Sequence, residues 1–389
     1  MNILQTLAQR YFELFKQSYI VVKAPGRLNI IGEHTDYNEG WVLPAAIDKH
    51  IYFALGKNAD PEYIEIYSPF FKESARFRIE AEDFAAIPAW AKYLQAAIME
   101  MRARGHAVKG VNGALDGNIP LGAGLSSSAA LCCGFILGVA QLNDIELSKA
   151  EIALIGQATE HRVGLNCGIM DQFSVMFGKK DQVIGLDCQS MEVSYSPLAL
   201  DQYQLVVFNS NIKHELAADS GYNDRRASCE RVVQVVQTEQ ADVKSLRDID
   251  AATIDRFQSK INPTDYKRAK YVLNENERVL STMTALKAGD WASVGANLYA
   301  SHAGMQQEYE ITVPEIDLLV DLTRDIDAVV GSRMTGGGFG GCTIAFIEQS
   351  QSIPVIEHIS QQYLKETGKE TTAYEIGIDD GVRVVGNNL

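Results

Sequence analysis

The feature that most constrains the fold of this chain is a glycine- and serine-rich segment at residues 120–130, which reads Pro-Leu-Gly-Ala-Gly-Leu-Ser-Ser-Ser-Ala-Ala. It follows a short apolar run at residues 111–115, which predicts a strand. It also opens an apolar segment at residues 129–142, which has the length of a helix. Gly122 and Gly124 allow the backbone to turn tightly and to approach a ligand closely. The segment therefore predicts a strand, a tight loop and a helix in succession.

The start of this helix has two interpretations. Ser126, Ser127 and Ser128 stand where the helix would begin, and a serine hydroxyl commonly satisfies the free N–H groups of a first turn. The same N–H groups, together with the positive end of the helix dipole, also form a phosphate site. The choice between an ordinary helix cap and a phosphate loop therefore depends on the rest of the chain.

The overall composition limits the partners of the chain. Its 389 residues predict two domains, and a formal net charge of −15 argues against nucleic acid or an anionic membrane as a partner. The six cysteines show no C-x-x-C spacing, which favours free thiols in a reducing compartment over disulfides or a zinc site. Residues 1–19 carry Arg10, Glu13 and Lys16 and so lack the apolar core of a signal peptide. We therefore expect a cytoplasmic protein, and we expect it to be a monomer.

One uncharged stretch, residues 117–143, is long enough to span a bilayer. Pro120, two glycines and three serines interrupt its first half. We therefore expect a buried glycine loop and a core helix here, and no membrane partner.

Hydrophobic periodicity predicts a mixed α/β chain. The predicted helices cover residues 4–15, 89–104, 129–142, 148–160, 172–177, 222–237, 263–288, 291–301 and 314–324. The predicted strands cover residues 20–24, 51–55, 63–67, 75–79, 111–115, 182–186, 193–195, 205–208, 328–333, 342–347 and 372–376. The pattern becomes mainly helical in the later part of the chain, so we place a domain boundary near residue 200, with domains at residues 1–200 and 201–389.

A dense group of polar residues lies in the turn-rich segment at residues 23–44. Its members are Arg27, Asn29, Glu33, His34 and Asp36. Sugar hydroxyls need such a mixture of donors and acceptors, so a sugar or polyol site ranks above a solvated loop. A metal site ranks last, because no second cluster is available to complete it.

Two carboxylates mark the segment at residues 159–173. Glu160 stands at the end of a predicted helix, and Asp171 follows the apolar Met170. A carboxylate held near an alcohol can orient it and accept its proton during phosphoryl transfer. The alternative is that Asp171 caps the helix predicted at residues 172–177.

The glycine cluster at residues 336–341 formally matches G-x-G-x-x-G. A predicted strand follows it in place of a helix, so the dinucleotide-binding interpretation fails. No Gly-Lys-Ser/Thr occurs either, which excludes a Walker A loop. The cluster more readily explains close packing of backbone against loops of the site.

Taken together, these segments indicate a small-molecule kinase, and the chain resembles the galactokinase family of the GHMP kinase superfamily. Residues 26–37 (Gly-Arg-Leu-Asn-Ile-Ile-Gly-Glu-His-Thr-Asp-Tyr) resemble the galactokinase signature, residues 121–129 the phosphate loop of the superfamily, and residues 335–341 its third motif. Residues 167–172 and 222–226 match two further galactokinase segments. The resemblance implies a ribosomal protein S5 domain 2-like N-terminal domain and a ferredoxin-like C-terminal domain.

The resemblance also implies roles for individual residues. Asp171 would be the catalytic base and Arg27 would stabilise the transferring phosphoryl group and hold Asp171 ionised. The sugar would contact Glu33, His34, Thr35, Asp36, Gly168 and Tyr222. The phosphates of ATP would contact Gly122, Ala123, Gly124, Leu125, Ser126, Ser127 and Ser128. Ser128 and Glu160 would hold Mg²⁺.

The implied reaction is ATP-dependent phosphorylation of α-D-galactose at its 1-hydroxyl, which gives galactose 1-phosphate and ADP in the first committed step of galactose catabolism. The alternatives are another sugar 1-kinase, acting on N-acetylgalactosamine or arabinose, and a non-catalytic sensor of galactose and ATP. One departure concerns the metal site, because galactokinases usually have one more residue between the positions of Glu160 and Asp171.

Overall fold

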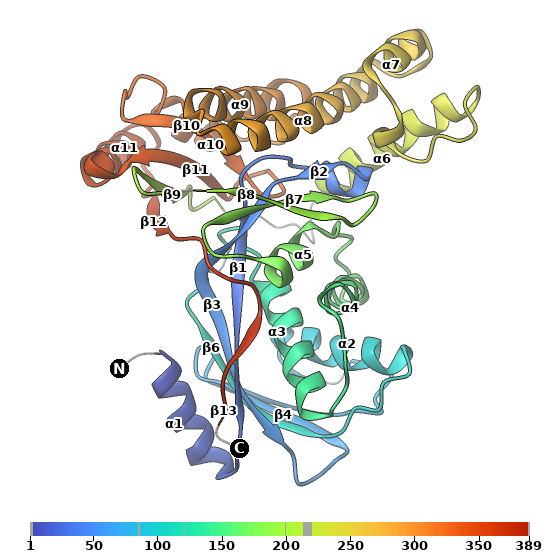
Figure 1. Ribbon diagram of the computed structural model, residues 1–389, viewed down its shortest axis with the longest axis vertical. Coiled ribbons are helices and arrows are strands. Elements are labelled where there is room, and N and C mark those ends of the chain that lie inside the picture. The colour runs from blue at the N-terminus through green and yellow to red at the C-terminus, as the bar shows by residue number, and fades with distance from the viewer. Residues whose placement is uncertain (1–2, 85, 121, 199, 213–219, 388–389) are drawn as a thin grey trace.

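The computed structural model describes residues 3–84, 86–120, 122–198, 200–212 and 220–387 of the chain (Figure 1). Leu121 of the predicted phosphate loop lies outside the described residues. The helices are α1 (Ile3–Phe15), α2 (Ala89–Ala103), α3 (Ser127–Leu142), α4 (Lys149–Arg162), α5 (Met170–Phe177), α6 (Ser220–Gln237), α7 (Ala251–Phe257), α8 (Pro263–Ala288), α9 (Trp291–Gly304), α10 (Pro314–Asp321) and α11 (Ser352–Thr367).

The strands are β1 (Ile20–Asn29), β2 (Trp41–Val42), β3 (Pro44–Lys57), β4 (Tyr63–Ser68), β5 (Glu73–Arg78), β6 (Val111–Gly117), β7 (Gln182–Asp187), β8 (Val193–Pro197), β9 (Tyr203–Asn209), β10 (Val329–Thr335), β11 (Cys342–Glu348), β12 (Thr372–Ile376) and β13 (Arg383–Asn387). Short helical turns are η1 (Asp36–Asn38), η2 (Leu246–Asp248), η3 (Gln258–Lys260), η4 (Met305–Tyr309) and η5 (Gln349–Gln351).

A six-stranded sheet of order β13-β1-β3-β6-β4-β5 forms the lower part of the molecule in Figure 1. The apolar helix α3 packs directly on this sheet, because Gly134 and Gly138 face Phe53 and Leu55 of β3 with no room for a side chain. The predicted core helix is therefore confirmed. None of the described helices qualifies as a membrane span.

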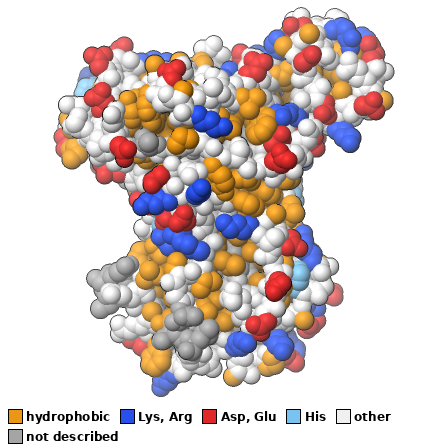
Figure 2. All heavy atoms as spheres, viewed as in Figure 1, with side chains coloured by type: hydrophobic (Ala, Val, Ile, Leu, Met, Phe, Trp, Pro, Cys, Tyr) orange, Lys and Arg blue, Asp and Glu red, His pale blue; other side chains and the backbone are white. Residues whose placement is uncertain are grey.

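A four-stranded sheet of order β10-β11-β9-β12 forms the upper part, where α8 and α9 run side by side (Figure 1). A small sheet of order β2-β7-β8 lies between the two larger sheets. On the face in Figure 2 the molecule narrows between the two parts, and Lys and Arg side chains gather at the narrow middle. This architecture of sheets covered by helices is the mixed α/β fold that the hydrophobic periodicity predicts.

Three predictions from the sequence were wrong or incomplete. The strand predicted to end at Pro25-Gly26 continues as β1 to Asn29, because the sheet absorbs the proline at a shift of register between Pro25 and Arg27. Asp171 does not cap α5, which starts at Met170 without a side-chain cap. The predictions also omitted β13 and α7.

The domain boundary near residue 200 stays a prediction. It falls between β8 and β9, where the chain passes from the small sheet to the four-stranded sheet. After β12 the chain returns to the six-stranded sheet, where β13 pairs with β1.

Asp379 fastens this returning segment to the six-stranded sheet. Its Oδ2 accepts hydrogen bonds from Lys23 Nζ of β1 at 2.7 Å and from His50 Nε2 of β3 at 2.8 Å. Its Oδ1 accepts one from Arg383 Nη2 of β13 at 3.1 Å. Although burial opposes the change, the hydrogen bonds from His50 and Lys23 lower the pKa of Asp379 well below its ordinary value. Asp379 therefore stabilises the fold in its ionised form.

We expect Asp379→Asn to lower the free energy of unfolding by about 1–3 kcal/mol at pH 7. A lowered pKa in the folded state stabilises at pH values above the unfolded pKa, so the difference should shrink below about pH 4. Denaturation at several pH values measures this, with the exposed Asp144→Asn as the control. A difference that persists unchanged at pH 3 would contradict the assignment.

Candidate active site

A cavity of about 150 Å³ brings the polar segments of the sequence together. Its wall comes from the end of β1 and the loop after it, the starts of α3, α5 and α6, the end of α4 and the loop that follows it, and the turn between β10 and β11. The lining residues are Arg27, Glu33, His34, Asp36, Ser128, Glu160, Gly164, Leu165, Asn166, Cys167, Gly168, Met170, Asp171, Tyr222, Asn223, Gly336 and Gly337.

Arg27 and Asp171 form an ion pair with two parallel hydrogen bonds at this cavity. Arg27 Nε donates to Asp171 Oδ1 and Arg27 Nη2 donates to Asp171 Oδ2, both at 2.7 Å. The third nitrogen, Nη1, donates to the carbonyl of Gly124 at 2.6 Å. The side chains are 7% and 19% exposed, so the pair is shielded while the carboxylate still reaches the cavity. Such a bidentate pair fixes the carboxylate in both position and orientation.

Ser126 adds a third contact to Asp171. It occupies the N-cap position of α3 with a positive φ of 52°, and its side chain makes no capping hydrogen bond. Its hydroxyl instead donates to Asp171 Oδ2. The ordinary helix-cap interpretation of this serine is therefore wrong.

The phosphate loop, which we define as residues 122–128, is fixed on β1. The backbone N–H of Arg27 donates to the carbonyl of Leu125 at 3.1 Å, and the Ala123 and Leu125 side chains are buried. Gly122 and Gly124 have φ of 72° and 66°, which favour glycine. Only Ser128 of this loop lines the cavity, at the first turn of α3.

Asp36 lies against Gly168 across the cavity wall. A Cβ on Gly168 would stand 1.8 Å from Asp36 Oδ2, so only glycine fits there. Burial, and next the nearby charge of Asp171, raise the pKa of Asp36 to about 6. The predicted sugar contacts Asp36 and Gly168 therefore lie side by side, and the pKa of the Asp36 carboxyl group lies near neutral pH.

Glu33 is buried and joins β1 to the turn after β10. It forms an ion pair with the fully buried Arg333 and accepts hydrogen bonds from the Gly336 N–H at 2.8 Å and from Asn29 Nδ2 at 2.6 Å. Burial raises the pKa of Glu33, although Arg333 opposes the shift. Sequence reasoning missed Arg333, because a lone arginine in a predicted strand carries no local signal.

The remaining predicted sugar contacts divide into two groups. His34 lies in a ring of tyrosines, with its ring centre 5.1 Å from that of Tyr222 and its Nδ1 2.7 Å from Tyr37 Oη. Thr35 does not line the cavity. Its buried hydroxyl lies between the carbonyls of Gly32 and Trp41, at 2.9 and 2.7 Å.

Glu160 and Ser128 suit a divalent cation that also contacts phosphates. Glu160 is 2% exposed; its Oε2 accepts from Cys167 Sγ at 3.0 Å and Gln172 Nε2 at 2.8 Å, while its Oε1 has no hydrogen-bond partner. The Ser128 hydroxyl is near enough to oppose the rise in the pKa of Glu160 that burial causes. No cluster of three His, Cys, Asp or Glu suited to a metal occurs among the described residues. One carboxylate and one hydroxyl fit Mg²⁺, which usually takes its remaining ligands from phosphate and water.

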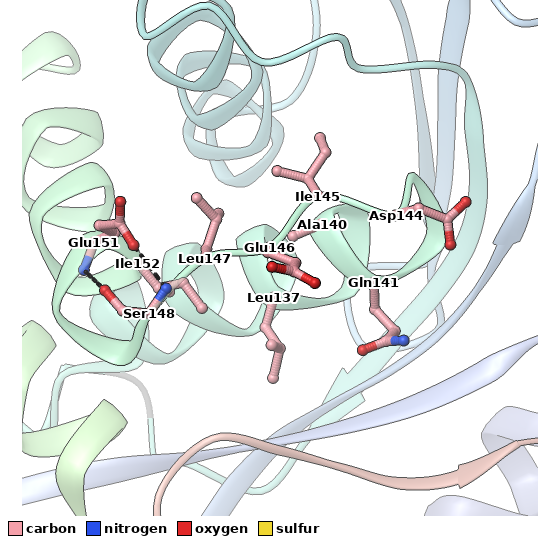
Figure 3. A pocket seen from close by; sticks show the side chains of 10 residues that line it. All are labelled: Leu137, Ala140, Gln141, Asp144, Ile145, Glu146, Leu147, Ser148, Glu151 and Ile152. Atoms are coloured by element: carbon pink, nitrogen blue, oxygen red, sulfur yellow. Dashed lines mark hydrogen bonds between the residues drawn. The ribbon is translucent and has the colours of Figure 1, made fainter.

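A second, more open hollow of about 750 Å³ lies between the end of α3 and the start of α4 (Figure 3). Ser148 and Glu151 there form a capping box for α4, which accounts for both side chains. Its other carboxylates, Asp144 and Glu146, are exposed. This hollow therefore lacks the buried polar groups that distinguish the first cavity.

Comparisons with known proteins bear on the fold and the family of the chain, and they confirm the GHMP kinase fold that the resemblance implied. The chain matches three family models: the galactokinase galactose-binding signature over residues 9–57, the GHMP kinases N terminal domain over residues 92–179 and the GHMP kinases C terminal over residues 282–365. A galactokinase from Thermotoga petrophila is 38% identical, with 94% of this chain and 99% of the relative covered. A galactokinase from Glaesserella parasuis is 39% identical, with 98% of both chains covered. The crystal structure of Lactococcus lactis galactokinase complexed with galactose superposes with a TM-score of 0.93 at 31% identity, covering 99% of this chain and 100% of that one.

We expect Asp36→Asn to raise the free energy of unfolding by about 1 kcal/mol at pH 8. A carboxyl group whose folded pKa is raised destabilises the fold as the pH rises through that pKa, here about 6. The gain should therefore shrink towards pH 5 and vanish below about pH 4. Denaturation of the variant and of the Asp144→Asn control measures it, and a gain that grows on acidification would refute it.

Proposed function

This chain belongs to the galactokinase family, and from that premise we propose that its cavity transfers the γ-phosphoryl group of ATP to the 1-hydroxyl of α-D-galactose. The observation that carries the proposal is the Arg27–Asp171 pair, held at 2.7 Å between the phosphate loop and the residues of the galactokinase signature. An acidic group fixed beside both predicted substrates is what phosphoryl transfer to an alcohol needs.

We assign the base to Asp171. Its carboxylate accepts the proton of the 1-hydroxyl as the 1-oxygen bonds to the γ-phosphorus. The bond between that phosphorus and the bridging oxygen of ADP breaks, which gives galactose 1-phosphate and ADP. Arg27 and Ser126 hold the carboxylate in one orientation, and Arg27 also supplies positive charge beside the transferring group.

We assign the sugar to Glu33, His34, Asp36, Gly168 and Tyr222, all of which line the cavity. Thr35 supports them through the backbone, because its hydroxyl is engaged by two carbonyls.

We assign the phosphates of ATP to the phosphate loop and to the free N–H groups at the start of α3. Ser128 and Glu160 would hold Mg²⁺, which when bound neutralises charge on the phosphate oxygens. An apolar hollow beside Ser127, lined in part by Phe70, Phe71 and Ile119, has the character that a purine base requires. The ring of Phe71 is itself stacked on the ring of Trp90, with the two ring centroids 6.0 Å apart.

The proposal also covers the cellular location and the oligomeric state of the protein. All six cysteines are free, five of them buried, which supports a reducing compartment, and we propose a cytoplasmic location. We also propose that the enzyme acts as a monomer on small molecules.

We expect Asp171→Asn to lower kcat by about 10²–10⁴-fold, because the amide cannot accept the proton. The binding of galactose, measured by calorimetry, should remain close to that of the unaltered protein. The exposed Asp144→Asn is the matched control and should keep full activity. A near-normal kcat in Asp171→Asn would show that Asp171 is not the catalytic base.

A panel of monosaccharides in a coupled ADP-release assay tests the substrate. We expect galactose to give the highest kcat/KM, ahead of N-acetylgalactosamine and arabinose. A higher value for either of these would make the chain another sugar 1-kinase. Binding of galactose and ATP without any release of ADP would instead identify a sensor.

A further inference from the structure

A buried carboxylate in the middle of α8 holds the backbone of the loop after β1. Glu275 is 0% exposed, and it accepts hydrogen bonds from the Gly32 N–H at 2.9 Å, from Ser301 Oγ at 2.7 Å and from Arg278 Nε at 2.7 Å. Glu275 is not among the residues that line the cavity. Its contact with Gly32 therefore reaches the site only through the backbone.

The next residue of α8 makes the same kind of contact at the other end of the loop. Asn276 Oδ1 accepts a hydrogen bond from the Trp41 N–H at 2.7 Å. One turn earlier, Tyr271 Oη donates to the carbonyl of Glu33 at 3.2 Å. Residues 32–41, which we name the sugar segment, are thus held at their first, second and last positions by one helix.

Steric contacts show that the sugar segment packs closely on α8 at both of its ends. A Cβ on Gly32 would stand 2.9 Å from Val279 Cγ2, and a Cβ on Gly40 would stand 2.4 Å from Asn276 Oδ1. Gly32 also has a φ of 103°, which favours glycine. The backbone therefore lies directly on the helix at both ends of the segment.

We propose that α8 positions the sugar segment, with Glu275 and Asn276 as positioning residues that set the affinity for galactose without touching it. The residues between the two anchors include Glu33, His34 and Asp36, the assigned sugar contacts. Because Asp36 must fit against Gly168, a small shift of the segment moves its carboxylate out of place. The inference rests on the proposed function, since it concerns the affinity for the proposed sugar.

The residues assigned to ATP provide a comparison within the same protein, because α8 does not hold the ones that the structure describes. The phosphate loop and Asp171 are held by β1 and Arg27, and α8 makes none of those contacts among the described residues. Loss of an anchor on α8 should therefore change the KM for galactose and leave the KM for ATP as it was. A residue that serves only the stability of the fold would not separate the two constants.

The decisive variant is Asn276→Ala, because Asn276 is half-buried and its removal leaves only the Trp41 N–H without a partner. We expect it to raise the KM for galactose roughly tenfold, with kcat and the KM for ATP unchanged. Asn276→Asp keeps the acceptor and should restore the KM. Glu277→Gln, an exposed change on the same helix, is the control and should have no effect.

Glu275→Gln tests the other anchor. Gly32, Ser301 and Arg278 all present donors, so the amide group of glutamine meets a donor in either orientation. We expect a rise in the KM for galactose of roughly tenfold or more. If this variant does not fold, the two Asn276 variants decide the question.

An unchanged KM for galactose in folded Asn276→Ala would overturn the inference. Equal changes in the KM for galactose, the KM for ATP and kcat would do the same, since they indicate a general structural role. The unaltered enzyme distinguishes these results from a failure of the proposed function, because an enzyme that does not phosphorylate galactose fails before any variant is made.

Discussion

The Arg27–Asp171 pair is the contact on which the rest of the site depends. Through it, three parts of the chain meet at one guanidinium group: the end of β1, the phosphate loop at Gly124 and the first turn of α5. A lysine could not replace Arg27, because one ammonium group lacks the planar fork that binds both carboxylate oxygens and a third acceptor. The position of the carboxylate is therefore tied to the position of the loop assigned to the phosphates.

The wall of the cavity contains more buried charge than stability alone would favour. Glu33 and Arg333 are 2% and 0% exposed in their side chains, and a buried ion pair of this kind often stabilises less than apolar residues of similar size. The raised pKa of Asp36 likewise shows that burial disfavours the ionised form of this carboxyl group, so Asp36 does not serve stability either. Such groups persist where they are needed for a particular geometry, here the joining of β1 to the turn after β10.

The sequence predicted those parts of the site whose chemistry is concentrated along the chain. The glycines of the phosphate loop and the polar residues after β1 are dense enough to be recognised in a short stretch of sequence. Helix α3 can be recognised by the length of its apolar run. Contacts between distant residues gave no such signal. Arg27 and Asp171 are 144 positions apart, and Gly32 and Glu275 are 243 apart. Local patterns also misled where tertiary structure overrides them, as at Pro25, where a bulge carries β1 onward.

Charge balance joins the fold to the proposed chemistry. Four carboxylates line the cavity, against one positively charged side chain, that of Arg27. Arg333 compensates Glu33, and Arg27 compensates Asp171, so Glu160 and Asp36 remain without a cationic partner among the described residues. An anionic nucleotide would be repelled by such a wall unless positive charge accompanied it. The proposed Mg²⁺ at Glu160 and the N–H groups at the start of α3 meet that requirement on the phosphate side. The raised pKa of Asp36 lessens the repulsion on the sugar side.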